Sequence, residues 1–109
     1  MYKVIKRLEI AAAHQLRLNN GSKCEALHGH NLIVTVHIRS ENLDENGMVY
    51  DFEDIKRLVC GKLDHVNLNN IIAQPTSENI AKYISEIIGE KCFKVEVQES
   101  ESSKAVYER

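Results

Sequence analysis

The chain has 109 residues, with 14 Lys and Arg against 16 Asp and Glu and a formal charge of −2. This length fits one domain, residues 1–109, around a single core, and the near-neutral charge disfavours nucleic acids and anionic membranes as partners. A hydrophobic content of 43% is typical of a globular protein, and no run approaches the roughly 20 apolar residues of a membrane span or begins like a signal peptide. Three cysteines without a Cys-x-x-Cys pair indicate free thiols in a reducing compartment, so we expect a cytoplasmic protein.

Two strands are predicted in the first forty residues, where apolar and polar side chains alternate. From Tyr2 to His14 the even positions are apolar except for Lys6, which is typical of a strand with one buried face. A second strand is expected from about His28 to Arg39, and its even positions again form the apolar set. The segment between the two strands contains Asn-Asn-Gly-Ser and is predicted to be a loop.

The period then changes to that of two helices. Apolar residues recur at steps of three and four behind Asp51, the predicted N-cap of a helix that ends near Leu63. A second helix is predicted from about Thr76, its cap, to Ile88, with Gly89 as its stop.

The last part of the chain returns to strand alternation. Phe93, Val95, Val97 and Glu99 are expected to share one face, and a short strand follows at 104–108. The order ββααββ predicts an α+β fold: a four-stranded antiparallel sheet with both helices on one face. Such a sheet has two open edges, so we expect a homo-oligomer.

Three histidines have the spacing of a metal site. His28 and His30 share one face of their strand, and His14 lies on the apolar parity near the end of the neighbouring strand. If the two strands pair antiparallel, the three rings converge, and three neutral imidazoles leave one position of a tetrahedral Zn²⁺ open, as in catalytic sites. The alternative is that these are hydrogen-bonded core histidines without a metal.

Other polar residues admit both a functional and a structural interpretation. Glu99 lies on the apolar parity and requires hydrogen-bond donors if it is buried, unless the strand ends before it. Asp64 and His65 fit either an acid/base pair or an ordinary helix terminus. Cys24 fits either a base held close to a metal site or a buried thiol.

Six sequence motifs occur together in one order: Ala12-Ala13-His14, Cys24-x-x-x-His28-Gly29-His30, Gly47-Met48-Val49-x-Asp51-Phe52, Leu63-Asp64-His65-x-x-Leu68-Asn69, Pro75-Thr76-Ser77-Glu78-Asn79 and a late Glu99. Together they resemble the 6-pyruvoyl-tetrahydropterin synthase family, and within it the bacterial 6-carboxy-tetrahydropterin synthase branch. The resemblance covers nearly the whole chain.

The resemblance implies a tunnelling fold (T-fold), whose sheets associate into barrels, commonly hexamers. It also implies a zinc-dependent lyase acting on 7,8-dihydroneopterin triphosphate, a small-molecule pterin. In the 6-carboxy branch the product is 6-carboxy-5,6,7,8-tetrahydropterin, on the route to queuosine, with release of acetaldehyde and triphosphate. The alternatives are a 6-pyruvoyl-tetrahydropterin synthase and a non-catalytic pterin- or metal-binding protein of the same fold.

The resemblance also assigns roles to individual residues. It assigns zinc binding to His14, His28 and His30, catalysis to Cys24, Asp64 and His65, and pterin binding to Glu99, Thr76 and Ser77. The chain departs from the family pattern at Ile10, where an aromatic residue is expected, and at Glu25, because some relatives use a glutamate near this position and cleave the side chain differently. The three-residue gap between Cys24 and His28 favours the carboxy product. The triphosphate requires cations, and the candidates are Arg17, Lys23, Lys82, Lys104 and Arg109.

Overall fold

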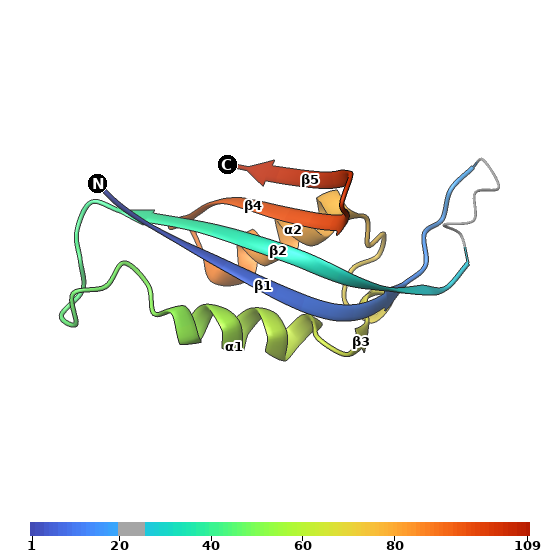
Figure 1. Cartoon of the computed structure of the whole chain (residues 1–109), viewed down its shortest axis with the longest axis horizontal. Coiled ribbons are helices and arrows are strands. Elements are labelled where there is room, and N and C mark those ends of the chain that lie inside the picture. The colour runs from blue at the N-terminus through green and yellow to red at the C-terminus, as the bar shows by residue number, and fades with distance from the viewer. Residues whose placement is uncertain (20–25) are drawn as a thin grey trace.

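The computed structural model describes residues 1–19 and 26–109, which form a five-stranded sheet with two helices on one face (Figure 1). The strands are β1 (Tyr2–His14), β2 (His28–Ser40), β3 (Val66–Asn67), β4 (Cys92–Ser100) and β5 (Ser103–Glu108). The helices are α1 (Phe52–Leu63), α2 (Ser77–Ile88) and the short 3₁₀ helix η2 (Leu68–Asn70). The predicted α+β class is confirmed.

The long pairing of β1 with β2 organises the sheet. The two strands run antiparallel along their whole length, from Tyr2 opposite Ser40 to His14 opposite His28. Their even-numbered residues face the helices, as the alternation predicts, and the central ones form the core with apolar residues of α1, α2 and β4. The metal-candidate histidines therefore lie at one end of the apolar face of this strand pair.

Both predicted N-caps are confirmed. The Asp51 side chain accepts a hydrogen bond from the Glu53 N–H, and the Thr76 side chain accepts one from the Asn79 N–H. Helix α2 ends at Ile88 and is capped by the predicted Gly89, whose φ of 115° lies in a region that side chains disfavour. In the described part of the chain, no helix is both long and apolar enough to cross a membrane.

The expected four-stranded antiparallel sheet is wrong in one respect, because the sheet has five strands and is mixed. The chain leaving α1 runs beside β1 for two residues, and this short strand, β3, pairs parallel with Ala12 and Ala13. The strand order is β3-β1-β2-β4-β5. A two-residue strand is too short to show alternation, so the sequence carries no periodic signal for it.

The expected face of Phe93 is also wrong, because β4 contains a β-bulge. The pairing of β4 with β2 shifts register next to Ile38, and Cys92, opposite Ile38, takes the buried position. The Phe93 ring lies on the face away from the helices, with its centroid 4.5 Å from the Arg39 guanidinium carbon and 5.4 Å from Lys3 Nζ. The extra residue of a bulge resets the alternation, so parity counted back from the later valines fails here.

The Arg109 guanidinium, which directly follows β5, forms hydrogen bonds at the C-terminal end of α2. Its Nε donates to the Cys92 carbonyl (2.8 Å) and the Ser85 hydroxyl (3.2 Å), and its Nη2 donates to the carbonyls of Ser85 (3.1 Å) and Gly89 (3.4 Å). The carbonyls of Ser85 and Gly89 also accept backbone bonds, from the N–H groups of Gly89 and Cys92, but they lie at the negative end of the helix dipole, which attracts cations. Arg109, considered above as a triphosphate ligand, is therefore engaged in a helix cap.

We expect Arg109→Ala to lower the free energy of unfolding by about 1–3 kcal/mol, because carbonyls at the end of α2 lose a charged donor. Urea unfolding followed by circular dichroism measures this effect. The matched control is Arg57→Ala: within the described part of the chain, the one polar side-chain contact of Arg57 is an exposed i,i+3 pair with Asp54 on α1, so its loss should cost less than about 0.5 kcal/mol. Equal losses in the two variants would contradict the capping role.

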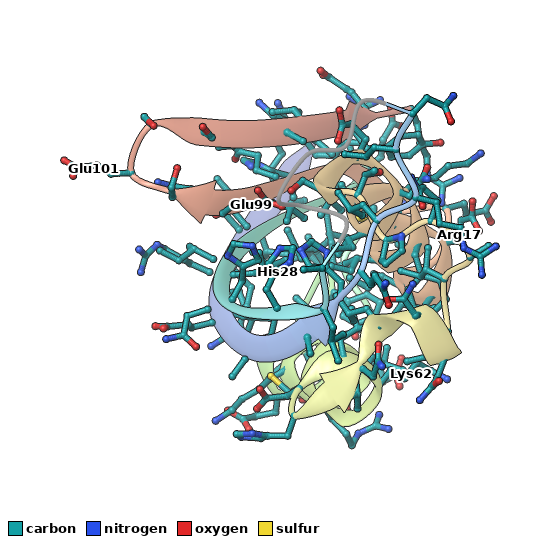
Figure 2. The ribbon with its side chains drawn as sticks, turned by 90° about the vertical axis from the view of Figure 1, so that its right-hand side faces the viewer. Arg17, His28, Lys62, Glu99 and Glu101 are labelled. Atoms are coloured by element: carbon teal, nitrogen blue, oxygen red, sulfur yellow. The ribbon has the colours of Figure 1, made fainter. Side chains whose placement is uncertain are left out.

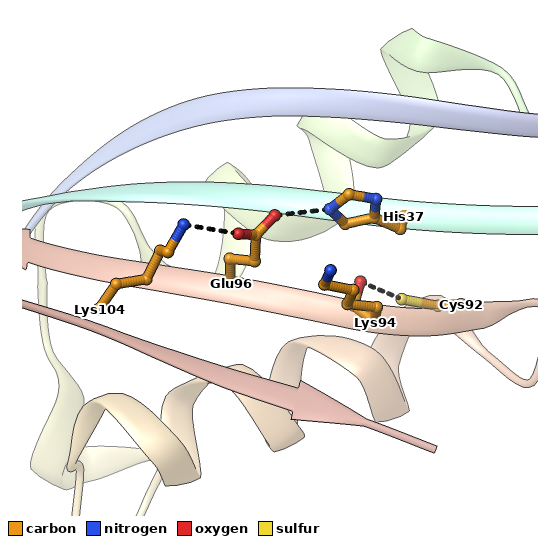
Figure 3. A network of polar contacts seen from close by, with 5 residues as sticks. All are labelled: His37, Cys92, Lys94, Glu96 and Lys104. Atoms are coloured by element: carbon orange, nitrogen blue, oxygen red, sulfur yellow. Dashed lines mark hydrogen bonds and ion pairs between the residues drawn. The ribbon is translucent and has the colours of Figure 1, made fainter.

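A polar cluster occupies the sheet face opposite the helices (Figure 3). Glu96 accepts hydrogen bonds from Lys104 Nζ at 2.9 Å and from His37 Nε2 at 2.6 Å. The bonds from Lys104 and His37 lower the pKa of Glu96 below its ordinary value of 4.5. His37 thus lies away from the other histidines of β2, as its odd position predicts.

The lowered pKa of Glu96 makes its contribution to stability dependent on pH. A carboxyl group whose pKa is depressed by folding stabilises the fold above its unfolded pKa, and this stabilisation is lost as the pH falls through the folded pKa. We therefore expect Glu96→Gln to be less stable than wild type near neutral pH, and the gap to narrow as the pH falls below 4.5, through the lowered pKa of Glu96. Urea unfolding over this range of pH measures it. A gap that is independent of pH would show that ionisation of Glu96 contributes nothing.

Candidate active site

The three predicted histidines converge at the end of the β1–β2 pair. His14 lies directly opposite His28, and His30 lies opposite Ala12, so all three side chains are on the helix-facing side. The ring centroids are 4.5–5.1 Å apart, and one ligand nitrogen from each ring lies within 4.8 Å of the others. The predicted grouping of the three rings, which required antiparallel pairing of the strands, is therefore present in the structure.

Backbone carbonyls orient two of these rings. Nδ1 of His14 lies 2.7 Å from the Pro75 carbonyl oxygen, and Nδ1 of His28 lies 2.6 Å from that of Ala26. A carbonyl oxygen only accepts, so each Nδ1 carries a proton and donates it. The Nε2 atoms of His14 and His28 then face each other, 3.0 Å apart.

This donor set fits a metal ion. Two neutral imidazoles so arranged bring two Nε2 lone pairs together, and a bound proton or metal ion removes the repulsion between them. Two nitrogens about 2.0–2.1 Å from one tetrahedral zinc lie roughly 3.3 Å apart, close to the separation in the structure. The outer Nδ1–H···O=C bonds of His14 and His28 are the usual supports of metal-bound imidazoles. His14, His28 and His30 are thus a candidate metal centre.

The charge state of His30 is influenced by its surroundings. Burial lowers the pKa of His30, the Glu99 carboxylate partly opposes this by raising it, and positive charge on His14 or His28 lowers it further. The net lowering favours the neutral imidazole, which is the form that binds a metal.

Glu99 is half-buried and lies on the same side of the sheet as the histidines, as Figure 2 shows for Glu99 and His28. A second register irregularity in β4 leaves Glu99 without a partner on β5. Its side chain lines a surface pocket of about 210 Å³ together with Ser77, the first residue of α2. Of the predicted pterin-binding residues, the structure therefore brings Glu99 and Ser77 together, whereas the Thr76 hydroxyl caps α2.

Asp64 and His65 form a pair at the edge of the sheet. Asp64 Oδ1 accepts from the Ala11 N–H at 2.8 Å, the His65 N–H donates to the Ala11 carbonyl at 2.6 Å, and Asp64 Oδ2 lies 3.6 Å from His65 Nε2. The backbone of His65 has a φ of 59°, which is uncommon for a residue other than glycine. The ring is 82% exposed. A carboxylate thus stands beside an accessible imidazole, an arrangement that can transfer protons.

The predicted catalytic Cys24 lies outside the described residues, as do Lys23 and Glu25. The other cysteines, Cys60 and Cys92, are free, and burial raises the pKa of both thiols. Cys92 is part of the hydrophobic core and Cys60 packs against it, so both behave as packing residues.

Two of the triphosphate candidates have protein partners. Arg109 caps α2, and Lys104 binds Glu96 while also lining the Glu99 pocket. Within residues 1–19 and 26–109, Arg17 and Lys82 make no ion pair.

Sequence reasoning did not find the groups that orient the histidine rings. The carbonyls of Ala26 and Pro75 carry no residue-type signal, since every residue has one. The side chains of Asn69 and Gln74, which bind the backbone just after His14, carry a weak signal: four of the eight residues from Asn67 to Gln74 are amides. The local sequence pattern does not show that these amides bind the backbone that follows β1.

Comparisons with known proteins agree with the geometry. A family model described as 6-pyruvoyl tetrahydropterin synthase matches residues 3–109. An Archaeoglobus fulgidus protein provisionally named 6-carboxy-5,6,7,8-tetrahydropterin synthase is 46% identical over 88 residues, which are 78% of this chain and 74% of that protein. A dihydroneopterin monophosphate aldolase of Pyrococcus furiosus is 40% identical over 89 residues, 79% of this chain and 74% of its own length. The 6-pyruvoyl tetrahydropterin synthase of Caenorhabditis elegans superposes with a TM-score of 0.78 at 28% identity, covering 99% of this chain and 95% of that one.

Proposed function

Because this chain belongs to the 6-pyruvoyl tetrahydropterin synthase family, we propose that it is a zinc-dependent carbon–carbon lyase. The proposed reaction converts 7,8-dihydroneopterin triphosphate and water to 6-carboxy-5,6,7,8-tetrahydropterin, with release of acetaldehyde and triphosphate, as a step toward queuosine. The 46% identity to the Archaeoglobus fulgidus protein supports this product. The observation that carries the proposal is the group of three imidazoles beside Glu99, on one side of the sheet.

Each part of the site has a proposed role. His14, His28 and His30 hold the zinc ion, which when bound stabilises negative charge on a substrate oxygen. Glu99 accepts two hydrogen bonds from the ring N–H and the exocyclic amine of the pterin, a planar pair of donors that matches a carboxylate. These assignments place the pterin ring in the pocket that Glu99 shares with Ser77.

Proton transfer is assigned to the remaining predicted residues. Asp64 is proposed to orient His65, so that the imidazole delivers and removes protons. Cys24 is proposed as a base that acts on the substrate side chain. Thr76 is still proposed to bind the pterin, because it lies next to Ser77. Its hydroxyl already accepts the capping hydrogen bond of α2.

The proposal is tested by product analysis. Zinc-loaded protein is incubated with 7,8-dihydroneopterin triphosphate, and acetaldehyde is measured together with the pterin products. One acetaldehyde per pterin consumed is expected, with none after zinc is removed by a chelator. A pyruvoyl pterin without acetaldehyde would instead identify a triphosphate-eliminating lyase, and no turnover with intact zinc and pterin binding would identify a binding protein.

A second candidate is favoured by the 40% identity to the dihydroneopterin monophosphate aldolase. Glu25, next to Cys24, is the residue type with which some relatives cleave the side chain differently. The same protein is therefore also incubated with 7,8-dihydroneopterin monophosphate. Turnover of the monophosphate without turnover of the triphosphate would replace the first candidate with the second.

We also propose that the protein acts as a homo-oligomer, with a hexamer favoured by the family resemblance. β5 is one edge strand of the sheet, and on the other edge β3 covers β1 only at Ala12 and Ala13. Unpaired strand edges are templates for pairing with a second chain. Light scattering coupled to size-exclusion chromatography measures the mass, and a monomer at micromolar concentration would contradict the proposal.

A further inference from the structure

Two side-chain amides bind the backbone that leaves β1 after His14. Asn69 accepts from the Gln15 N–H at 2.7 Å and donates to the Gln15 carbonyl at 2.9 Å. Gln74 accepts from the Arg17 N–H and donates to the Arg17 carbonyl, both at 3.0 Å. Each amide thus satisfies both backbone groups of one residue, and the two residues alternate as they would along a strand paired with a neighbour.

The backbones of Asn69 and Gln74 are themselves held by neighbouring side chains. The Asn69 N–H binds the side chain of Asn67 at 3.0 Å, and the Gln74 carbonyl accepts from the Asn79 side chain, in the first turn of α2, at 2.9 Å. The residue after Gln74 is Pro75, whose carbonyl accepts from the His14 ring. The same short segment therefore fixes both the ring of His14 and the backbone that follows it.

From these contacts we propose that Asn69 and Gln74 are positioning residues that hold His14 in the orientation a bound metal requires. This assignment rests on the proposed function, in which His14 is a zinc ligand. The pairing of β1 with β2 ends at His14, so beyond it the two amides replace a strand partner. The ring is only 2% exposed, and a shift of the backbone would carry its Nε2 away from that of His28.

A role confined to folding makes a different prediction from a positioning role. If the amides only stabilise the fold, their loss lowers the unfolding free energy and leaves the zinc affinity of the folded protein unchanged. If they position His14, zinc affinity falls by about 10- to 100-fold, as for other groups that orient metal ligands.

The test uses Asn69→Asp and Gln74→Glu, which keep size and acceptor but place a carboxylate oxygen against the backbone carbonyl that the amide NH₂ now binds. The matched control is Asn70→Asp, the same change at an exposed neighbour in η2. Zinc affinity is measured by competition with a chromogenic chelator, and unfolding of the zinc-free proteins by urea. An added negative charge by itself strengthens cation binding, so weaker binding in the two variants reports positioning.

We expect both variants to bind zinc about 10- to 100-fold more weakly, with faster hydrogen exchange at the Gln15 and Arg17 amides, and the Asn70→Asp control to bind zinc at least as tightly as wild type. Gln74→Met removes both bonds without adding a charge, and it should weaken binding in the same direction even if a carboxylate disturbs folding. If the variants fold and exchange their Gln15 and Arg17 amide hydrogens faster but bind zinc with unchanged affinity, the positioning role is wrong, and the proposed function is not affected. Wild-type protein that binds no zinc would overturn the proposed function and the assignment with it.

Discussion

Replacing His28 by alanine should abolish stoichiometric zinc binding and, with it, turnover of the pterin triphosphate. The His28 Nε2 lies 3.0 Å from that of His14, and the three imidazoles are the only metal-binding group of this kind in the described residues. With two nitrogens left, affinity should fall by more than the 10- to 100-fold that loss of an outer-shell partner typically costs. Metal analysis after gel filtration and chelator competition measure the loss.

The matched control for this prediction is His37→Ala. His37 lies on the same strand, but its ring faces the other side of the sheet and binds Glu96. The control should keep full zinc content and lose only the stabilisation that the ring gives to the Glu96 cluster. Zinc bound one-to-one in folded His28→Ala protein, with wild-type affinity, would contradict the metal centre.

The grouping of the histidines could be predicted because it depends only on alternation. A period of two places His28 and His30 on one face, and an unbroken apolar set carries His14 onto the corresponding face of β1. A shift of one residue in the pairing would turn these side chains to the opposite face. Burial of so many apolar residues on both strands excludes that shift, so the sequence strongly specifies the register.

The features that escaped prediction depend on contacts between distant segments. The bulge that displaces Phe93 arises where β4 meets β2, and alternation within β4 alone does not show it. The bond of Asn69 to Gln15 spans 54 residues, and that of Gln74 to Arg17 spans 57. From the sequence alone, an amide residue at an exposed position is interpreted as an ordinary loop residue. Only the fold shows which backbone groups its side chain binds.

Replacing Glu99 by glutamine should weaken pterin binding about 10- to 100-fold, the effect of losing hydrogen bonds to a charged group. The amide presents an NH₂ group where the pterin also presents donors, so one of the two proposed bonds becomes a repulsive contact. Zinc content should not change, because Glu99 is proposed to bind the pterin and the imidazoles hold the metal. Titration of 7,8-dihydroneopterin against zinc-loaded protein, followed by pterin fluorescence, gives the dissociation constant.

Glu101→Gln is the control, since it makes the same substitution two residues further along. Glu101 is exposed on the β4–β5 turn and points away from the site, as Figure 2 shows. The two variants have the same net charge. A difference in their pterin affinity therefore reports the loss of the Glu99 carboxylate at the Ser77 pocket, and not the general loss of one negative charge. Equal pterin affinity in the two variants, each with full zinc content, would remove Glu99 from the binding site and leave the ring of the substrate without its proposed anchor.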